Sequence, residues 1–335
     1  MSEPIYVLYA LSFDSPVHFG QTENGGSLVD TGAAYRSDQL FSALYMELAR
    51  EDDKKELTWL MEKTGTGALR FSSLFPWQEQ GDEIAYYLPR PLLRMPRNTT
   101  GEQESYQKVC RGSTQRKRAK KLKYLRASSL ISYLHKEQAG ETWDEYPSFG
   151  ESAVNIRVNC RGEEPRPYFV GAFSFRRGAG LYLIARVEKE EEADRFAEVL
   201  EWLGYSGIGG KRSSGYGKFH LADDPLFLYD EGMYKDDSAL YAMLMNEQAP
   251  WQMTVSTVLP AEEALPDFSR SYYRLQRIGG FVTSAKMGEK KASVTMLDAG
   301  SCFPKRFPGQ MAMLGSSEGH PVYRYGYGLF LGVEV

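Results

Sequence analysis

One stretch of the sequence, from Gly204 to Gly217, constrains the fold more than any other. It reads GYSGIGGKRSSGYG, and six of its 14 residues are glycine, which permits positive φ and close approach of another backbone. In its middle, Lys211, Arg212, Ser213 and Ser214 supply two cations and two hydroxyls, which suit phosphate oxygens. Neither the Walker spacing nor the dinucleotide fingerprint fits. The stretch therefore predicts an anion-binding loop, with a long flexible turn as the alternative.

The elements before this loop follow a regular order. Strands are expected where β-branched and aromatic residues gather, and helices where apolar residues recur at helical spacing. The expected elements are a strand at Ile5–Phe13, a helix opening at Ser37 or Asp38, a hairpin of Tyr168–Phe175 with Leu181–Val187, a helix at Glu190–Leu203 and a last strand at Tyr216–Leu221. This β-α-β-β-α-β order is that of the ferredoxin-like fold, which is also the fold of the RNA-recognition motif.

A chain of 335 residues is long enough for two domains, and we expect an α+β protein with two tandem ferredoxin-like (RRM-like) domains. The first covers residues 1–222 and carries a long insertion at about 89–167. An acidic, turn-rich segment, Asp223 to Asp237, begins the second domain, which covers residues 223–335. That half is mostly β, so we expect a degenerate version of the fold, with a small β-barrel as the alternative.

The net charge of −4 hides a basic tract. Between Lys108 and Arg126 the sequence has nine Lys/Arg residues and no Asp/Glu, with Tyr124 interleaved. Such a run suits an RNA backbone, because each neutralised phosphate releases counterions, although many charge runs are only solvated loops. The candidate RNA contacts in the tract are Arg116, Lys117, Arg118, Lys120, Lys121 and Lys123.

Patterns for metals, disulfides and membranes are missing from the sequence. The three cysteines and four histidines are scattered singly, with no ligand spacing and no C-x-x-C pair. No apolar run reaches membrane-spanning length, and the N-terminus lacks the regions of a signal peptide. We therefore expect a cytoplasmic protein with no metal, no cofactor and no membrane contact.

A further group of candidates surrounds the SYYRLQRIGG segment, which reads as a strand ending at a Gly-Gly break. Strand alternation predicts Tyr272 and Arg274 on one face, where they could stack a base and grip a phosphate. Arg270 and Arg277 flank them, and Arg324 near the C-terminus lies in a similar aromatic and basic setting. The segment is explained equally well if its tyrosines lie in the core and its arginines lie on the surface.

His18 follows the first strand and precedes Phe19 and Gly20. A histidine there could act as a general base on an RNA 2′-hydroxyl. No partner for such a role is evident in the sequence, so a structural or RNA-contacting histidine is favoured. Asp38 could likewise be a catalytic carboxylate, but a helix cap explains it without chemistry.

Five segments now support a resemblance. SPVHFG, RSDQLFSAL, GIGGKRSSGYGKF, RIGGFV and HPVYRYG occur in this order across nearly the whole chain. Together they resemble the RAMP superfamily of CRISPR proteins, and more narrowly the fourth Csm subunit of type III-A effector complexes. The glycine-rich loop alone would indicate only the superfamily.

This resemblance implies a cap on the 5′ handle of the CRISPR guide RNA (crRNA). It implies contacts with the large polymerase/nuclease subunit and the backbone RAMP subunit, and a β-hairpin thumb at the target RNA near the 5′ end of the guide. We expect the thumb within the insertion, between Pro89 and Pro167. The handle contacts carried over from the motifs are His18, Ser37, Gly207, Gly209, Gly210, Lys211, Arg212, Ser213, Ser214, Arg277 and Arg324.

Two functions from different classes follow. The first is a non-catalytic RNA-binding scaffold, in line with the family, where cleavage belongs to other subunits. The second is a RAMP endoribonuclease that processes precursor crRNA with His18 as general base. A purely protein-binding subunit is disfavoured by the basic tract and the loop cations. The fold cannot decide between the first two, so the site must.

Overall fold

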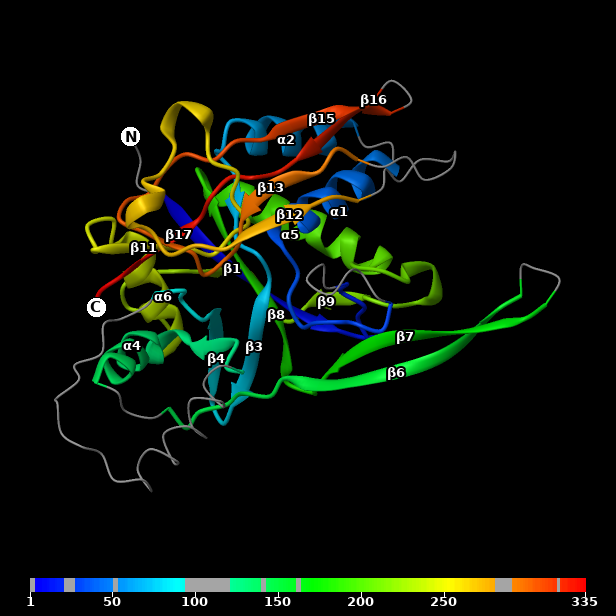
Figure 1. Cartoon of the computed structure of the whole chain (residues 1–335), viewed down its shortest axis with the longest axis horizontal. Helices are drawn as coiled ribbons and strands as arrows, with labels where there is room; N and C mark the ends of the chain where they lie inside the picture. Colours follow the sequence, from blue (N-terminus) through cyan, green and yellow to red (C-terminus); the bar gives the residue numbers. More distant parts are fainter. Residues whose placement is uncertain are drawn as a thin grey trace.

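The computed structural model of the chain describes residues 4–20, 28–50, 54–93, 121–139, 143–160, 164–280, 291–317 and 320–335. It is a mixed α/β structure in which one large sheet is covered on both faces (Figure 1). The α-helices of the described part are α1 (Ser37–Arg50), α2 (Lys54–Gly65), α4 (Leu130–Ala139), α5 (Glu190–Ser206) and α6 (Lys235–Met245).

The large sheet has eight strands, in the order β10-β1-β8-β3-β4-β5, with β2 paired to β8 and β9 paired to β1. Its central pair is antiparallel, from Ile5↔Val187 to Leu11↔Leu181. The strands are β1 (Ile5–Phe13), β2 (Arg70–Phe71), β3 (Phe75–Gln80), β4 (Glu83–Pro89), β5 (Tyr124–Arg126), β8 (Ala179–Val187), β9 (Phe219–Leu221) and β10 (Leu226–Phe227).

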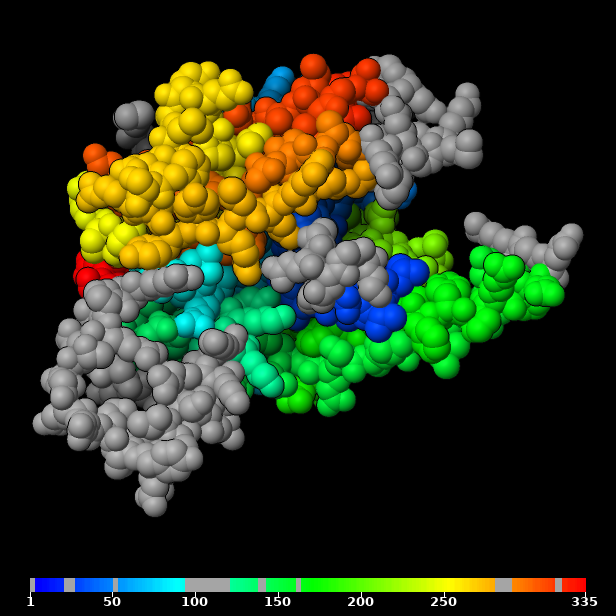
Figure 2. Space-filling view, in the orientation of Figure 1, coloured from blue at the N-terminus to red at the C-terminus, as the bar shows by residue number. Residues whose placement is uncertain are grey.

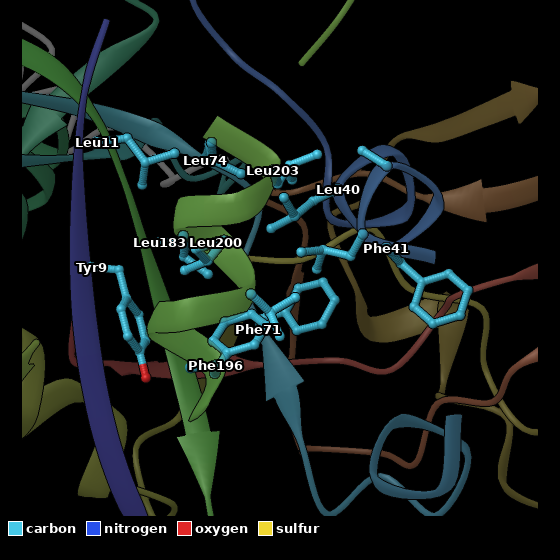
Figure 3. Close-up of a cluster of buried hydrophobic side chains, with 14 of the residues drawn as sticks. Tyr9, Leu11, Leu40, Phe41, Phe71, Leu74, Leu183, Phe196, Leu200 and Leu203 are labelled. Atoms are coloured by element: carbon cyan, nitrogen blue, oxygen red, sulfur yellow. The ribbon is translucent and has the colours of Figure 1, made fainter. Parts of the chain in front are cut away.

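Within this sheet, β9-β1-β8-β2 are neighbours in that order and antiparallel throughout. Helix α1 lies between β1 and β2 in the chain, and α5 lies between β8 and β9. This is the order in which a β-α-β-β-α-β unit arranges its strands. The helical face is packed by Phe196 of α5, which meets Tyr9 edge-on at 5.4 Å and stacks on Phe71 at 5.8 Å (Figure 3).

The second half of the chain completes both faces of the same sheet. It contributes Tyr325 to the helical face, where the ring stacks on Phe71 at 4.5 Å and Phe41 at 5.5 Å. Its three-stranded sheet, β14-β11-β17, packs Met253 and Leu331 on the other face, against Leu8 of β1. The two halves therefore share their cores, and the tandem ferredoxin-like arrangement stays a prediction. The strands of this half are β11 (Trp251–Thr254), β12 (Leu275–Ile278), β13 (Val294–Leu297), β14 (Cys302–Phe303), β15 (Ala312–Ser317), β16 (His320–Arg324) and β17 (Phe330–Val333).

The expected hairpin of Tyr168–Phe175 with Leu181–Val187 is wrong in its pairing. The strands form, but β7 (Arg166–Phe175) pairs with β6 (Gly150–Asn159), in register from Gly150↔Phe175 to Asn159↔Arg166. Both edges of β8 are already occupied, by β1 on one side and by β2 and β3 on the other, so no edge is left for β7. The β6–β7 hairpin instead extends away from the body of the molecule (Figures 1 and 2).

The segment expected to begin the second domain is bonded to the first half of the chain. Asp236, at the start of α6, is completely buried. Its carboxylate accepts hydrogen bonds from the backbone N–H of Tyr86 at 2.9 Å and of Ser128 at 3.0 Å, and from Nε of Arg126 at 2.9 Å. One side chain thus connects α6 to β4, β5 and the turn before α4.

Replacing this carboxylate should destabilise the whole fold. Asp236→Asn leaves at least one buried donor without an acceptor and removes one of the two carboxylates that pair with Arg126, the other being Glu83. We therefore expect a loss of about 2–4 kcal/mol in the free energy of unfolding. Urea denaturation measures it. The matched control is Asp224→Asn, because Asp224 is exposed. Equal stability of the two variants would contradict the joining role.

Candidate nucleic-acid interface

A polar pocket of about 320 Å³ lies where the glycine-rich loop meets segments from both ends of the chain. The residues that line it come from the segment after β1, α1 and the residues just before it, the loop, the segment after β12, the residue Lys291 before β13, and β16. They are His18, Phe19, Gly20, Tyr35, Arg36, Gln39, Ser42, Ala43, Met46, Gly209, Gly210, Arg212, Gly279, Gly280, Lys291 and Arg324. All five segments that carry the family resemblance contribute residues to the lining, and RSDQLFSAL supplies the α1 wall.

Glycine is required at two positions of the loop. A Cβ on Gly209, where φ is +87°, would lie 2.7 Å from Cδ1 of Phe19, and one on Gly210 would lie 2.7 Å from Cδ2 of His18. Their absence lets the loop lie directly on this segment, where the Gly210 N–H donates to the His18 carbonyl at 2.9 Å. The glycines therefore form one wall of the pocket, as close backbone approach predicts.

His18 is buried, and its Nδ1 lies 2.8 Å from the carbonyl oxygen of Gly171 on β7. A carbonyl only accepts, so Nδ1 carries the proton of this bond. The ring is thereby fixed between the loop and the base of the β6–β7 hairpin. Among the described residues, His18 is the one histidine that lines the pocket.

A buried carboxylate organises the cations of the pocket. Asp38, with a fully buried side chain, accepts from Nε of Arg36 at 2.9 Å and from Nη1 of Arg324 at 2.7 Å. Nη2 of Arg324 reaches the carbonyl oxygen of Gly279 at 3.4 Å. Asp38 thus joins the start of α1 to β16 and to the turn after β12.

The pocket keeps an excess of positive charge. Arg36, Arg212, Lys291 and Arg324 line it, and Asp38 behind them pairs with Arg36 and Arg324. Burial lowers the pKa of the Lys291 ammonium, and the neighbouring Arg324 lowers it further. A bound anion would relieve both costs.

A larger groove of about 890 Å³ continues from the pocket. The two share Phe19, Gly20, Tyr35, Arg36 and Gln39. Basic side chains follow the groove beyond the shared wall; they are Arg90, Lys121, Lys123 and Arg274. The pocket and the groove therefore form one continuous path with basic side chains along it, which suits an extended polyanion.

The β6–β7 hairpin is attached to the glycine-rich loop by two aromatic contacts. Nζ of Lys211 lies 4.8 Å from the ring centre of Tyr168, and the Tyr216 hydroxyl accepts from Nδ2 of Asn155 at 2.8 Å. Burial would raise the pKa of Tyr216, but hydrogen bonds from Arg157 and Asn155 lower it overall. Lys211, with φ of 63°, is the one non-glycine residue of the described chain in the left-handed region.

One expected contact is wrong. Ser37 is completely buried, its Oγ accepts from the N–H of Thr257 at 2.9 Å, and its own N–H donates to Oγ of Ser73 at 3.1 Å. A side chain enclosed in this way cannot touch RNA. Ser37 instead holds the start of α1 against the second half of the chain.

The other expected contacts divide into three groups. His18, Gly209, Gly210, Arg212 and Arg324 line the pocket, and Lys121, Lys123 and Arg274 line the groove. The other described candidates line neither cavity; they are Gly207, Lys211, Ser213, Ser214, Arg270, Tyr272 and Arg277. Tyr272 packs its ring on Trp251 at 5.3 Å, which makes it a poor platform for a base. Arg116, Lys117, Arg118 and Lys120 lie outside the described residues.

Sequence reasoning missed Arg36, Gln39 and Lys291. Arg36 and Gln39 lie within the RSDQL segment itself, and helical spacing could have placed Gln39 on the exposed side of α1. The local sequence around Lys291 gives no indication that this residue lines the pocket, because its position depends on contacts between residues far apart in the chain. No group of three or more His, Cys, Asp or Glu side chains in the described part is placed to hold a metal ion. No described helix is long and apolar enough to cross a membrane.

Known proteins resemble the chain along its full length. The family model described as the CRISPR Csm4 C-terminal domain matches residues 247–333. The "CRISPR system Cms protein Csm4" of Mycobacterium tuberculosis (strain CDC 1551 / Oshkosh) is 30% identical over 331 residues, which cover 97% of this chain and 96% of that protein. The protein of the same description from Streptococcus thermophilus is 28% identical, with 98% and 99% covered.

Solved structures share the fold. A chain of the Csm1-Csm4 cassette in complex with pppApA has a TM-score of 0.58 at 21% identity, with 99% of each chain covered. A chain of the Csm3-Csm4 subcomplex in the type III-A CRISPR-Cas interference complex has a TM-score of 0.58 at 16% identity, with 99% of this chain and 100% of that chain covered.

The fold and the full-length likeness define a RAMP-type protein of the CRISPR systems. Within that class, the 30% sequence identity to the M. tuberculosis relative, over 97% of this chain, shows the family to which the chain belongs. The chain belongs to the Csm4 family, which confirms the resemblance carried by the five segments.

Removing the hydroxyl group of Tyr216 tests how the hairpin is attached to the loop. Tyr216→Phe removes the acceptor for Asn155 and keeps the ring, so amides of β6 and β7 should exchange with solvent roughly 2- to 10-fold faster. Hydrogen–deuterium exchange measures this. Tyr229→Phe is the matched control, because Tyr229 is 55% exposed. Unchanged hairpin exchange in Tyr216→Phe would show that the hydrogen bond between Tyr216 and Asn155 does not hold it.

Proposed function

We propose that this chain is a non-catalytic subunit of a type III-A effector complex that binds and caps the 5′ handle of the crRNA. The observation that carries the proposal is the pocket itself. Segments as far apart as His18 and Arg324 meet there, and they surround one cavity with cations and glycine backbone. Phosphate oxygens are bound by such groups.

The shape of the interface favours a single strand. A pocket of about 320 Å³ that leads into a groove of about 890 Å³ is a concave site that suits a splayed single strand. Arg90, Lys121, Lys123 and Arg274 along the groove would follow the backbone of the handle. A strand end in the pocket fits the role of a cap.

The partners of the solved relatives support the assembly. Relatives of the same fold occur in a Csm1-Csm4 cassette and a Csm3-Csm4 subcomplex. We propose that this chain likewise contacts the large polymerase/nuclease subunit and the backbone RAMP subunit. We also retain two tandem ferredoxin-like domains, residues 1–222 and 223–335, as part of the proposal.

The β6–β7 hairpin would serve as the thumb at the target RNA near the 5′ end of the guide. Its outer face pairs Ile156 with Phe169, and these side chains are 68% and 52% exposed. Val154 and Val158 extend the same apolar face. An exposed apolar surface on a projecting arm is suited to contact bases or a partner subunit.

An endoribonuclease with His18 as general base is the alternative. Its support is that His18 lines a cationic pocket together with Lys291, whose lowered pKa brings it nearer to a proton-transfer role. The bond from Nδ1 of His18 to Gly171 explains the histidine equally well as a structural residue. The size of RNA recovered from the test below separates the two functions.

Reversing the loop cations should impair guide loading. In complexes assembled with the partner subunits, we expect Lys211→Glu with Arg212→Glu to lower crRNA occupancy by at least about tenfold, because attraction for phosphates becomes repulsion. The control is the reversal of Arg177, which is exposed and lines neither cavity.

Occupancy is measured as guide RNA per complex, and the size of the RNA is read in the same gel. Normal occupancy in the double variant would contradict the loop assignment. Shortened precursor RNA that returns to full length in His18→Ala would favour the nuclease.

A further inference from the structure

Two guanidinium groups in the pocket have buried N–H donors that find no acceptor. Nε of Arg324 and Nη1 of Arg212 are both enclosed, and neither has a hydrogen-bond partner among the described residues. The whole Arg324 side chain is only 5% exposed. A buried donor on a charged group that stays unpaired is costly, so a site with two of them indicates an absent acceptor.

The two terminal nitrogens of Arg324 each make a bond inside the protein. Nη1 is paired with Asp38 at 2.7 Å, and Nη2 reaches the carbonyl of Gly279 at 3.4 Å. These two bonds fix the plane of the guanidinium, and Nε is the nitrogen of this group that has no partner among the described residues. Asp38 is therefore a positioning residue, which orients Arg324 without occupying Nε.

The charge around these donors selects the acceptor. Lys291 lines the same pocket, and the pKa of its ammonium is lowered first by burial and then by Arg324. A third cation beside two guanidinium groups favours an anion over a neutral base edge. A phosphate presents several oxygens in different directions. This matches donors that come from Lys291 before β13, from the loop and from β16.

We propose that Arg324 Nε, Arg212 Nη1 and the Lys291 ammonium form a seat for a single phosphate group of the bound RNA. The seat rests on the proposed function and makes it specific: one phosphate of the handle contributes far more to binding than the others. The phosphate is an internal phosphodiester or a 5′-terminal phosphate, which share this chemistry.

The test replaces one phosphate at a time. Handle RNAs that carry a single methylphosphonate linkage, in which one charged oxygen becomes a methyl group, are bound to the full chain assembled in its complex. We expect one position to weaken binding by about 10- to 100-fold, because charge-assisted hydrogen bonds are lost there. A parallel arm compares 5′-phosphorylated with 5′-hydroxyl RNA, and a tenfold preference for the phosphate would assign the seat to the terminal group.

Substitutions in the seat test whether the sensitive phosphate is bound there. Arg324→Lys can keep the ion pair with Asp38 but lacks Nε, and Lys291→Gln leaves that pair untouched. Each should weaken binding of unmodified RNA by about tenfold, and each should bind the sensitive methylphosphonate RNA no worse than the unaltered protein does. Lys218→Gln is the control, because Lys218 is exposed and lines neither cavity.

The outcomes separate the seat from the proposed function. Normal binding of handle RNA with no sensitive phosphate at any position would overturn the seat and leave the proposed function standing. A sensitive phosphate whose effect is undiminished in Lys291→Gln and Arg324→Lys would place the seat elsewhere and also overturn it. Absence of any handle binding by the assembled chain would overturn both.

Discussion

The interface depends on the ion pair between Asp38 and Arg324, two side chains separated by 286 positions in the chain. Taking both charges out of water is expensive, and the attraction compensates only because the pair is close and further bonded. Arg36 and the carbonyl of Gly279 supply those further bonds. The result is that the start of α1, the end of β12 and the last part of the chain are held at one point, and the pocket forms between them.

Another residue of the pocket, His18, links it to the hairpin. His18 contacts the loop through its backbone carbonyl and β7 through its ring, so one residue spans the pocket wall and the base of the β6–β7 hairpin. Lys211 and Tyr216 attach the loop to the hairpin from the other side. A strand bound in the pocket and a duplex beside the hairpin would therefore be held in a fixed relation, which is what a cap at a guide end requires.

Local chemistry could be predicted from the sequence, and long-range pairing could not. The strand at Ile5–Phe13, the helix ending at the glycine-rich loop and the need for glycine at Gly209 and Gly210 follow from composition and spacing alone. The partner of β7 was missed because strand pairing depends on which edges other strands leave open. Ser37 was misassigned because a motif match says nothing about burial, and Lys291 enters the pocket only through the fold.

The most direct test of this account is photocrosslinking of crRNA in the assembled complex. Guide RNA with a photoreactive nucleotide at its 5′ end would be irradiated, and the linked peptides identified by mass spectrometry. The account predicts crosslinks to the glycine-rich loop between Gly204 and Gly217 and to the segment around His18. Crosslinks confined to surfaces outside the pocket and the groove would contradict it, because the 5′ end of the guide would then be held elsewhere.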